Sequence, residues 1–243
     1  MKEELIKVLQ IEKRFESHAV LKGVSFSLNK HENLVVIGKS GSGKSVLLKI
    51  IIGLIAPDKG SVEVLGKDIC RLKELDLRQL RKKIGYLFQD GALFDSMTVR
   101  QNLEFPLKRQ VQRKTDEEIE ELVHQSLKKV GLSNAIDKMP DQLSGGMKKR
   151  VALARALMLE PEIILFDEPT TGLDPVTSKE INRLIIESRD KLGISGIVVT
   201  HDMYCVKTVG DRLVALNEGT ITEVGGMSEL NAREEKWLRE FFE

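Results

Sequence analysis

The chain has 243 residues, of which 41% are hydrophobic and 31% are charged, and this composition supports one large α/β domain or a core with a smaller lobe. Its 38 basic and 37 acidic residues leave a formal net charge of +1, and only 5% of the residues are aromatic. This balance offers neither a basic footprint nor a stacking platform, so we expect no nucleic-acid partner.

Cysteine usage and hydropathy bear on the compartment. Cys70 and Cys205 do not form a C-x-x-C pair, so ordinary reduced thiols are expected rather than a metal or redox site. Residues 1–7 have no apolar core of the kind found in secretory signals. The most apolar run, residues 46–55, is interrupted by a lysine and a glycine and falls short of the roughly 20 residues that span a bilayer. We therefore expect a cytoplasmic chain that reaches a membrane only through a partner.

The first part of the chain is rich in predicted strands. Residues 5–36 alternate short apolar runs with turns, and apolar side chains occupy every second position of residues 24–28. A turn is predicted at residues 57–60, and a strand resumes at residues 61–66. These elements predict a β-rich subdomain around the glycine-rich loop at residues 38–45.

The most specific motif of the chain is a phosphate-binding loop at residues 38–45. The pattern G-x-x-x-x-G-K-[ST] is matched at every fixed position by Gly38-Lys39-Ser40-Gly41-Ser42-Gly43-Lys44-Ser45. An apolar strand precedes the loop and an apolar helix follows it, which is the geometry that holds a nucleoside triphosphate. The glycines and serines of the loop are expected to surround the phosphates with backbone amides at a helix N-terminus. Lys44 is predicted to reach the β- and γ-phosphates, and the Ser45 hydroxyl is predicted to bind Mg²⁺.

After residue 70 the pattern changes from strands to helices. Residues 70–83 are charged and helix-prone, and residues 83–88 form a predicted strand that ends at Gln89. A capping box at residues 115–118 begins a helix with apolar residues at helical spacing, and Gly131 is typical of its end. We expect an inserted helical lobe here.

Regular alternation of strands and helices returns at residue 163. Strands are predicted at residues 163–166 and 196–200, with an amphipathic helix at residues 179–192 between them, a pattern that favours a mainly parallel sheet. Asp167 and Glu168 follow the first strand at its carboxyl end, where open α/β sheets bind ligands. Asp167 is predicted to hold Mg²⁺, and Glu168 is predicted to act as the general base for an attacking water.

A histidine ends the next strand at the same edge. The run Thr200-His201-Asp202 places His201 where it could donate a hydrogen bond to the γ-phosphate. The other histidines lack this context and are expected to be surface or packing residues; they are His18, His31 and His124.

A second helix start suited to an anion lies outside the αβ core. Leu143-Ser144-Gly145-Gly146-Met147 opens a helix that continues to Leu157. A serine followed by two glycines fits an anion at a helix N-terminus, although serine is also a common N-cap without a ligand.

Taken together, the motifs resemble those of ABC-type ATPase domains over nearly the whole chain. Residues 143–147 stand in the family's signature motif, Gln89 matches its glutamine loop, residues 172–175 match its D-loop, and His201 matches its switch histidine. Phe15 falls where the family carries an aromatic residue that stacks on adenine, with a core position as the alternative. The resemblance implies that Gln89 and His201 join Lys44 and Glu168 in catalysis, and that Gln89 joins Ser45 and Asp167 around Mg²⁺.

The resemblance also implies a fold and an assembly. We expect a P-loop NTPase of the α/β class, with a mainly parallel RecA-like core sheet, an antiparallel β subdomain and an inserted helical subdomain. It implies a head-to-tail dimer in which each Mg²⁺–ATP lies between the phosphate loop of one chain and the signature residues of the other, with hydrolysis releasing the two chains. ATP contacts are implied for Ser144, Gly145, Gly146 and the D-loop residue Asp174. The expected divisions are a nucleotide-binding core with its β subdomain at residues 1–90 and 161–225, a helical subdomain at residues 91–160 and a C-terminal helical tail at residues 226–243.

One segment is similar to a particular branch of the family. The run Gly-Ala-Leu-Phe-Asp-Ser-Met-Thr-Val at residues 91–99, with Phe-Pro-Leu at residues 105–107 and Met147 in the signature, resembles the ATPase subunits of MCE-type (Mla-like) lipid transport systems in bacteria. The resemblance implies integral-membrane permease partners, an MCE-type substrate-binding protein and a small cytoplasmic regulator. The chain would then sit at the inner face of the cell membrane through its permease. An exposed stretch at residues 92–94 would suit permease docking, with packing against the helical lobe as the alternative.

Two further segments allow more than one reading. The tail carries apolar residues on one side of a probable helix, and packing on its own core is the default. Lys148, Lys149 and Arg150 accompany the signature of the same branch, with a solvated helix face as the alternative.

Two functions remain in competition. The first is the ATP-hydrolysing subunit of a membrane transporter that moves phospholipid or a related lipid. The second is a soluble ABC ATPase of the iron–sulfur assembly type, which drives assembly of a cytosolic complex. The segment at residues 92–95 favours transport.

Overall fold

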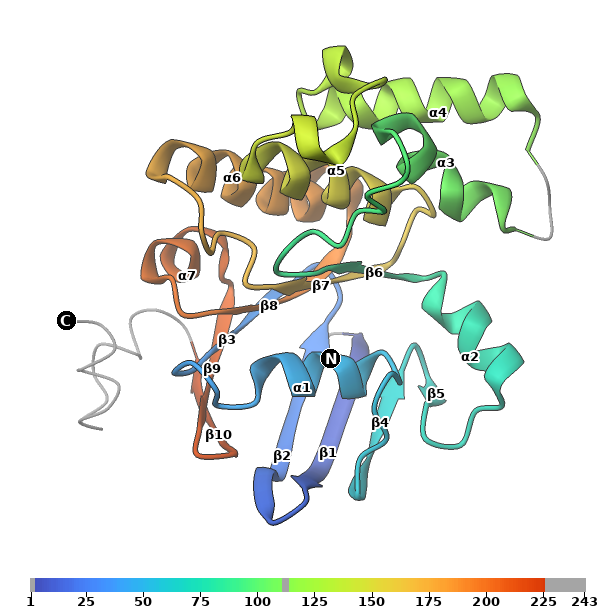
Figure 1. Cartoon of the computed structure of the whole chain (residues 1–243). Coiled ribbons are helices and arrows are strands. Elements are labelled where there is room, and N and C mark those ends of the chain that lie inside the picture. Colours follow the sequence, from blue (N-terminus) through green and yellow to red (C-terminus); the bar gives the residue numbers. More distant parts are fainter. Residues whose placement is uncertain (1–2, 111–113, 226–243) are drawn as a thin grey trace.

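The structure is a computed structural model of the chain, and it describes residues 3–110 and 114–225 (Figure 1). The predicted C-terminal tail lies outside the described residues. None of the helices in the described part is both long and apolar enough to cross a membrane.

The N-terminal strands form an antiparallel sheet in the order β2-β1-β4-β5. Its members are β1 (Glu4–Phe15), β2 (His18–Asn29), β4 (Lys59–Val64) and β5 (Lys67–Asp68). The alternation predicted in β2 is present, because Val24 and Leu28 are fully buried and Phe26 packs against the same core. This sheet is the expected β-rich subdomain.

A second, six-stranded sheet is the centre of the fold, in the order β10-β9-β3-β8-β7-β6. Its members are β3 (Asn33–Ile37), β6 (Ile84–Leu87), β7 (Ile163–Asp167), β8 (Ser195–Thr200), β9 (Arg212–Asn217) and β10 (Thr220–Gly225). All neighbours pair in parallel except β9 and β10. Because β3, β8 and β7 are adjacent and parallel, the phosphate loop, His201 and Asp167 leave the sheet at one edge.

Helices cover both faces of the central sheet. Helix α1 (Lys44–Ile51) lies between the two sheets and buries Leu47, Leu48, Ile50 and Ile51 against both (Figure 1). The opposite face carries a second apolar core formed with α5 (Gly145–Leu157), α6 (Pro175–Leu192) and α7 (Met203–Val209). Helix α2 (Glu74–Arg81) precedes β6. The mainly parallel core sheet, the antiparallel sheet and the inserted helices agree with the predicted fold class.

A third apolar core lies among the inserted helices. It is shared by α3 (Val99–Lys108), α4 (Asp116–Lys129), α5 and short 3₁₀ turns at Ser133–Ala135 and Pro140–Gln142. The predicted capping box begins α4, where the Thr115 hydroxyl accepts from the amide of Glu118 and the Glu118 carboxylate accepts from the amide of Thr115. Helix α6 begins four residues earlier than predicted, because Asp174 caps it and Pro175 fits its first turn.

Candidate functional site

The phosphate loop connects β3 to α1 with a backbone that requires glycine. Gly41 and Gly43 have φ angles of 79° and 101°, which side chains rarely allow. At Gly43 a Cβ atom would also lie 2.8 Å from Cγ1 of Val20. The loop therefore presents backbone amides and the N-terminus of α1 to a ligand.

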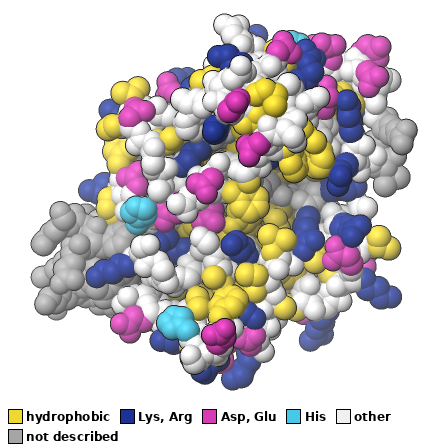
Figure 2. All heavy atoms as spheres, in the orientation of Figure 1, with side chains coloured by type: hydrophobic (Ala, Val, Ile, Leu, Met, Phe, Trp, Pro, Cys, Tyr) yellow, Lys and Arg dark blue, Asp and Glu magenta, His cyan; other side chains and the backbone are white. Residues whose placement is uncertain are grey.

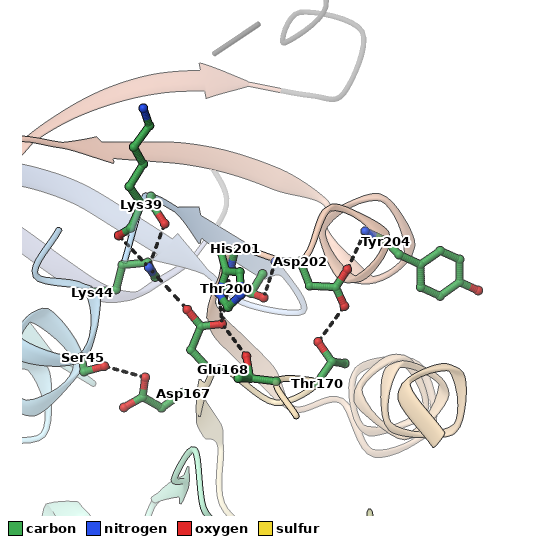
Figure 3. Close-up of polar contacts among 12 residues, drawn as sticks. Lys39, Lys44, Ser45, Asp167, Glu168, Thr170, Thr200, His201, Asp202 and Tyr204 are labelled. Atoms are coloured by element: carbon green, nitrogen blue, oxygen red, sulfur yellow. Dashed lines mark hydrogen bonds and ion pairs between the residues drawn. The ribbon is translucent and has the colours of Figure 1, made fainter. Parts of the chain in front are cut away.

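Lys44 is held in the concave side of this loop. It is the first residue of α1 and is only 6% exposed. Its ammonium donates to the carbonyl oxygens of Gly38 at 2.8 Å and Lys39 at 3.2 Å, and it lies 3.4 Å from Oε1 of Glu168 (Figure 3). A buried ammonium that carbonyl oxygens hold in place can form charge-assisted hydrogen bonds with phosphate oxygens.

Ser45 and Asp167 meet across the gap between α1 and β7. The Ser45 hydroxyl donates to Oδ1 of Asp167 at 2.8 Å, and the Tyr86 hydroxyl donates to Oδ2 of Asp167 at 3.1 Å. Burial, followed by the negative charge of Asp167, raises the pKa of Tyr86, so the phenol stays a neutral donor. Tyr86 was not identified from the sequence.

The Glu168 carboxylate contacts three side chains. His201 Nδ1 lies 2.8 Å from its Oε2, the Thr171 hydroxyl donates to the same oxygen at 3.0 Å, and Lys44 faces Oε1. Burial acts to raise the pKa of Glu168, but the contact with His201 and the positive charge of Lys44 outweigh burial and hold that pKa below its usual range. The carboxylate is therefore ionised at neutral pH, as a general base must be.

His201 is positioned by the start of α7. Asp202 caps that helix by accepting from the amide of Tyr204 at 2.9 Å, and it also accepts from the Thr170 hydroxyl at 2.7 Å. These contacts tie the end of β8 to the loop that follows β7 (Figure 3). The His201 side chain is half exposed, so one face is free to meet a ligand.

An open cleft of about 340 Å³ runs along this edge of the sheet. It is lined by Phe15, His18, Val20, Ser40, Gly41, Gly43, Lys44, Ser45, Val46, Gln89, Glu168 and His201. Phe15 is 43% exposed, so the core alternative for this residue is wrong, and its contact with adenine stays a prediction. His18 is exposed, as expected for a surface residue, and it also lies on the cleft wall beside the end of β1.

The residues present fit Mg²⁺ and a triphosphate. The Ser42 hydroxyl is buried and has no hydrogen-bond partner among the described residues, which suits an acceptor placed in the loop. A carboxylate and a hydroxyl at Asp167 and Ser45, with the Gln89 amide on the same cleft, are hard oxygen ligands of the kind that Mg²⁺ combines with phosphates and water. No group of three or more His, Cys, Asp or Glu side chains within the described ranges could hold a metal by itself.

Four predicted ATP contacts that lie outside the phosphate loop do not line the cleft. Ser144 caps α5 by accepting from the amide of Met147 at 3.3 Å, and Gly145 and Gly146 form the first turn. Asp174 caps α6 and accepts from the amides of Val176 and Thr177 at 2.9 and 3.0 Å. Their implied contact with ATP held by a second chain stays a prediction.

One expectation about the signature helix is wrong in part. Lys149 does not lie on a solvated face, because it is 5% exposed and its ammonium donates to the carbonyl oxygens of Glu168 and Thr171. Its position on α5 turns it inward toward the β7–α6 loop, whereas its neighbours Lys148 and Arg150 remain partly exposed. The run of three basic residues gave no sign of this difference.

Comparison with known proteins places this geometry among characterised relatives. A sequence model described as ABC transporter matches residues 21–171. The chain is 41% identical over 254 residues to the chloroplastic protein TRIGALACTOSYLDIACYLGLYCEROL 3 of Arabidopsis thaliana, covering 98% of this chain and 73% of that protein. It is 39% identical over 236 residues to the probable ribonucleotide transport ATP-binding protein mkl of Mycobacterium leprae, covering 97% of this chain and 68% of that protein.

A solved structure agrees with the sequence relatives. The dimeric post-hydrolysis state of the ATP-binding cassette MJ0796, bound to ADP and Pi, superposes with a TM-score of 0.83 at 33% identity and covers 91% of this chain and 100% of that one. That neighbour holds its hydrolysis products as a dimer.

Proposed function

The chain belongs to the ABC transporter family as an ATP-binding domain that binds Mg²⁺–ATP and hydrolyses it, and we propose that it powers a membrane transporter for phospholipid or a related lipid. The observation that carries the ATPase assignment is the convergence of Lys44, His201 and Thr171 on the ionised carboxylate of Glu168 beside the phosphate loop.

The proposed chemistry follows from the positions of these side chains. Lys44 and the loop amides would hold the β- and γ-phosphates, and Ser45, Asp167 and Gln89 would hold Mg²⁺, which neutralises phosphate charge when bound. Glu168 accepts a proton from water as the water oxygen bonds to the γ-phosphorus and the bond to ADP breaks. His201, which contacts the Glu168 carboxylate, would orient the γ-phosphate. Phe15 stacks on the adenine ring at the open end of the cleft.

The dimer completes the site in this proposal. ABC ATPases assemble as dimers beneath permease partners, and the solved neighbour is dimeric. Ser144, Gly145 and Gly146 would contact the γ-phosphate bound by the other chain, and Asp174 would lie at the same junction. The first amides of a helix have no partner within the helix, and an anion from a partner chain would satisfy those of Gly145 and Gly146 at the start of α5.

An apolar surface beside the glutamine loop supports a permease partner. Phe94 is 40% exposed, its ring centroid lies 4.6 Å from that of Phe105, and Arg155 and Arg109 lie over the two rings. A hollow of about 320 Å³ there is shared with Ala92 and Pro106. Figure 2 shows apolar side chains gathered near β6 and α3 on a face where charges of both signs are otherwise interspersed. An exposed aromatic pair of this kind fits an apolar helix of a membrane partner.

The lipid assignment depends on the segment at residues 91–107 and on one relative. That segment resembles the ATPases of MCE-type systems, and the Arabidopsis relative carries the name of trigalactosyldiacylglycerol, a lipid. The mycobacterial relative is named for ribonucleotide transport, which makes a nucleotide the competing substrate. An MCE-type substrate-binding protein and a small regulator belong to the same proposal, as does attachment to the inner face of the membrane.

One experiment tests the catalytic part. The E168Q variant is expected to keep ATP affinity, to dimerise in ATP and to lose turnover by about 100-fold or more, because the base is removed while the phosphate contacts stay. Sedimentation and phosphate release measure the two properties. Turnover at the parent rate would remove Glu168 from the role of base.

A second experiment tests the partner and the substrate. The complex is purified from native membrane through the tagged full chain, and its proteins and bound small molecules are identified by mass spectrometry. A multi-spanning protein with bound lipid is expected. Soluble scaffold proteins alone would favour the assembly ATPase, and bound nucleotide or nucleoside other than ATP and ADP would favour the competing substrate.

A further inference from the structure

The loop after β7 holds its catalytic carboxylate in a strained backbone. Glu168 has a φ angle of 49°, a left-handed conformation that is strained for a residue with a side chain. Such a conformation persists only when neighbouring groups fix it. The backbone amide of Glu168 donates to Val199 at 3.0 Å, and its carbonyl accepts from the amide of Thr171 at 3.3 Å.

A buried lysine completes this bracing. The ammonium of Lys149 donates to the carbonyl oxygen of Thr171 at 2.6 Å and to that of Glu168 at 3.2 Å. Among the described residues it forms no ion pair. Burying an ammonium is costly unless it forms hydrogen bonds. Two hydrogen bonds of Lys149 go to the first and last residues of the Glu168–Thr171 turn. The same turn carries the Thr171 hydroxyl that donates to the Glu168 carboxylate.

Lys149 stands on the helix that begins with the signature residues. It lies just over one turn after Ser144, the N-cap of α5. The first turn of α5 also packs tightly on the following segment, since a Cβ atom on Gly146 would fall 2.1 Å from Cγ2 of Thr177. A shift of α5 therefore reaches the first turn of α6 through Gly146 and Thr177, and it reaches the β7–α6 turn through the Lys149 ammonium.

We propose that Lys149 is a positioning residue that fixes the Glu168–Thr171 turn, and with it the general-base carboxylate, to the signature helix of the same chain. This inference rests on the proposed role of Glu168. In the proposed dimer, the signature helix of a chain contacts the ATP bound by the partner's phosphate loop, and Glu168 of the same chain acts on the ATP bound by its own phosphate loop. Lys149 connects this helix with this carboxylate. The position of the signature helix at one ATP therefore sets the geometry of hydrolysis at the other.

The test compares two neighbours on one helix in the full-length protein. K149M removes the ammonium and keeps an unbranched stem, K149Q keeps a hydrogen-bond donor without the charge, and K148M is the matched control at the partly exposed neighbour. K149M is expected to lower kcat about 10- to 100-fold, the size of effect that follows misplacement of a catalytic group by about 1 Å. ATP affinity by calorimetry should stay within about twofold, because both hydrogen bonds that Lys149 forms with the described residues go to the β7–α6 turn and not to the phosphate loop. K149Q should recover part of the loss, and K148M should match the parent.

Two further readouts separate positioning from general damage. Hydrogen exchange in nucleotide-free protein should accelerate at the amides of Thr171 and Leu173 in K149M and not in K148M. In the E168Q background K149M should cause no additional loss of residual turnover, since two residues that act as a unit are non-additive.

The outcomes test the positioning role of Lys149 separately from the general-base role of Glu168. Parent-like turnover and exchange in K149M, with E168Q inactive, would overturn the positioning role alone. Equal losses of thermal stability, ATP affinity and turnover in K149M and K149Q would overturn it too, because they would mark a purely structural lysine. Parent-like turnover in E168Q would instead remove the proposed base.

Discussion

Asp167 has its two carboxylate oxygens committed to different elements, one to Ser45 on α1 and the other to Tyr86 on β6. The tyrosine reaches it because Tyr86 pairs with Leu165 across parallel strands, and residues two apart in a strand share a face. A hydrogen bond to a metal-binding carboxylate fixes its orientation. Tyr86 therefore belongs to the support of the proposed Mg²⁺ site, although no motif marks it.

This support gives a testable consequence for metal affinity. We expect Y86F to lower the apparent affinity for Mg²⁺ in the presence of ATP by about tenfold. This is the lower end of the range for losing a hydrogen bond to a metal-binding carboxylate. The chain offers a matched control, since its other tyrosine, Tyr204, is 48% exposed on α7. Titration of Mg²⁺ at fixed ATP measures the effect by calorimetry. An Y86F curve that overlays that of Y204F would show that the phenol does not orient Asp167.

Site residues that stand at a fixed spacing in a motif could be predicted from the sequence. Site residues whose role depends on contacts with distant segments could not. Lys44, Ser45, Asp167, Glu168 and His201 were found because each follows a strand or glycine loop with a fixed spacing. Tyr86 and Lys149 act through contacts with segments about 80 and 20 residues away. Nothing in their own neighbourhood distinguishes a phenol or an ammonium that points inward from one that faces solvent.

At the scale of elements, Asn102 of α3 secures the loop that carries the proposed docking surface. Its amide nitrogen donates to the carbonyls of Phe94, Met97 and Thr98, and its amide oxygen accepts from the amide of Phe94 at 2.9 Å. Asn102 is fully buried, so these bonds form away from water. Asn102 therefore holds the loop at residues 94–98 to the start of α3.

A second buried asparagine, Asn182, serves as the matched control for Asn102. Asn182 of α6 is equally buried, yet its amide has no hydrogen-bond partner among the described residues. We expect N102L to lower the free energy of unfolding by about 3 kcal/mol, because it removes the side-chain partners of the Phe94 amide and the Met97 carbonyl, and N182L to cost less than about 1 kcal/mol. Urea unfolding measures both. Equal losses in the two variants would mean that the hydrogen bonds of Asn102 do not secure the loop.

A buried ion pair joins the two sheets at the turn between β2 and β3. Glu32 accepts from Arg212 Nε at 2.7 Å and from the amide of Asn29 at 2.8 Å, and Arg212 also donates to the carbonyl of Ser27. Burial acts to raise the pKa of Glu32, but the hydrogen bonds and the guanidinium charge outweigh it, so the pKa lies below its ordinary value of 4.5. The contacts connect β9 with a segment 180 residues earlier.

The sign of the pH effect follows from that direction. A carboxyl group with a lowered folded pKa stabilises the fold above its unfolded pKa, and this contribution is lost as pH falls from about 4.5 through the folded pKa. We expect E32Q to cost roughly 3 kcal/mol at pH 7, the lower end for breaking a buried pair, and to cost less near pH 3. Unfolding at both pH values measures the difference. A cost that is independent of pH would exclude ionic stabilisation by Glu32.

At the scale of the whole molecule, local patterns predicted the kinds of elements and not their order in space. Alternation of strands and helices predicted a parallel sheet, but the order β10-β9-β3-β8-β7-β6 brings β3 beside β8 and β9, far along the chain. That order depends on long-range packing of α1 and α5–α7, which periodicity does not encode. The boundaries at residues 90 and 160 stay a prediction, while the inserted helices do have an apolar core of their own.

The proposed assembly makes its strongest prediction at this scale, because each ATP site would take its halves from different chains. K44A removes the phosphate-loop contribution, and S144R blocks the signature contribution. In a head-to-tail pair of one K44A chain and one S144R chain, both lesions fall in one site and the other site is intact. In the E168Q background each variant alone is expected to stay monomeric with ATP, and an equimolar mixture should form dimers, at most about half of the chains if pairing is random.

Sedimentation velocity with and without ATP measures the dimer fraction. Single-chain ATP affinity of the S144R chain should equal that of the parent, because Ser144 lies outside the cleft of its own chain. A mixture that remains monomeric while unmodified E168Q dimerises would contradict shared sites, as would dimers of S144R alone. Restoration by mixing cannot arise if each chain completes its own site, since no chain in the mixture then has both halves intact.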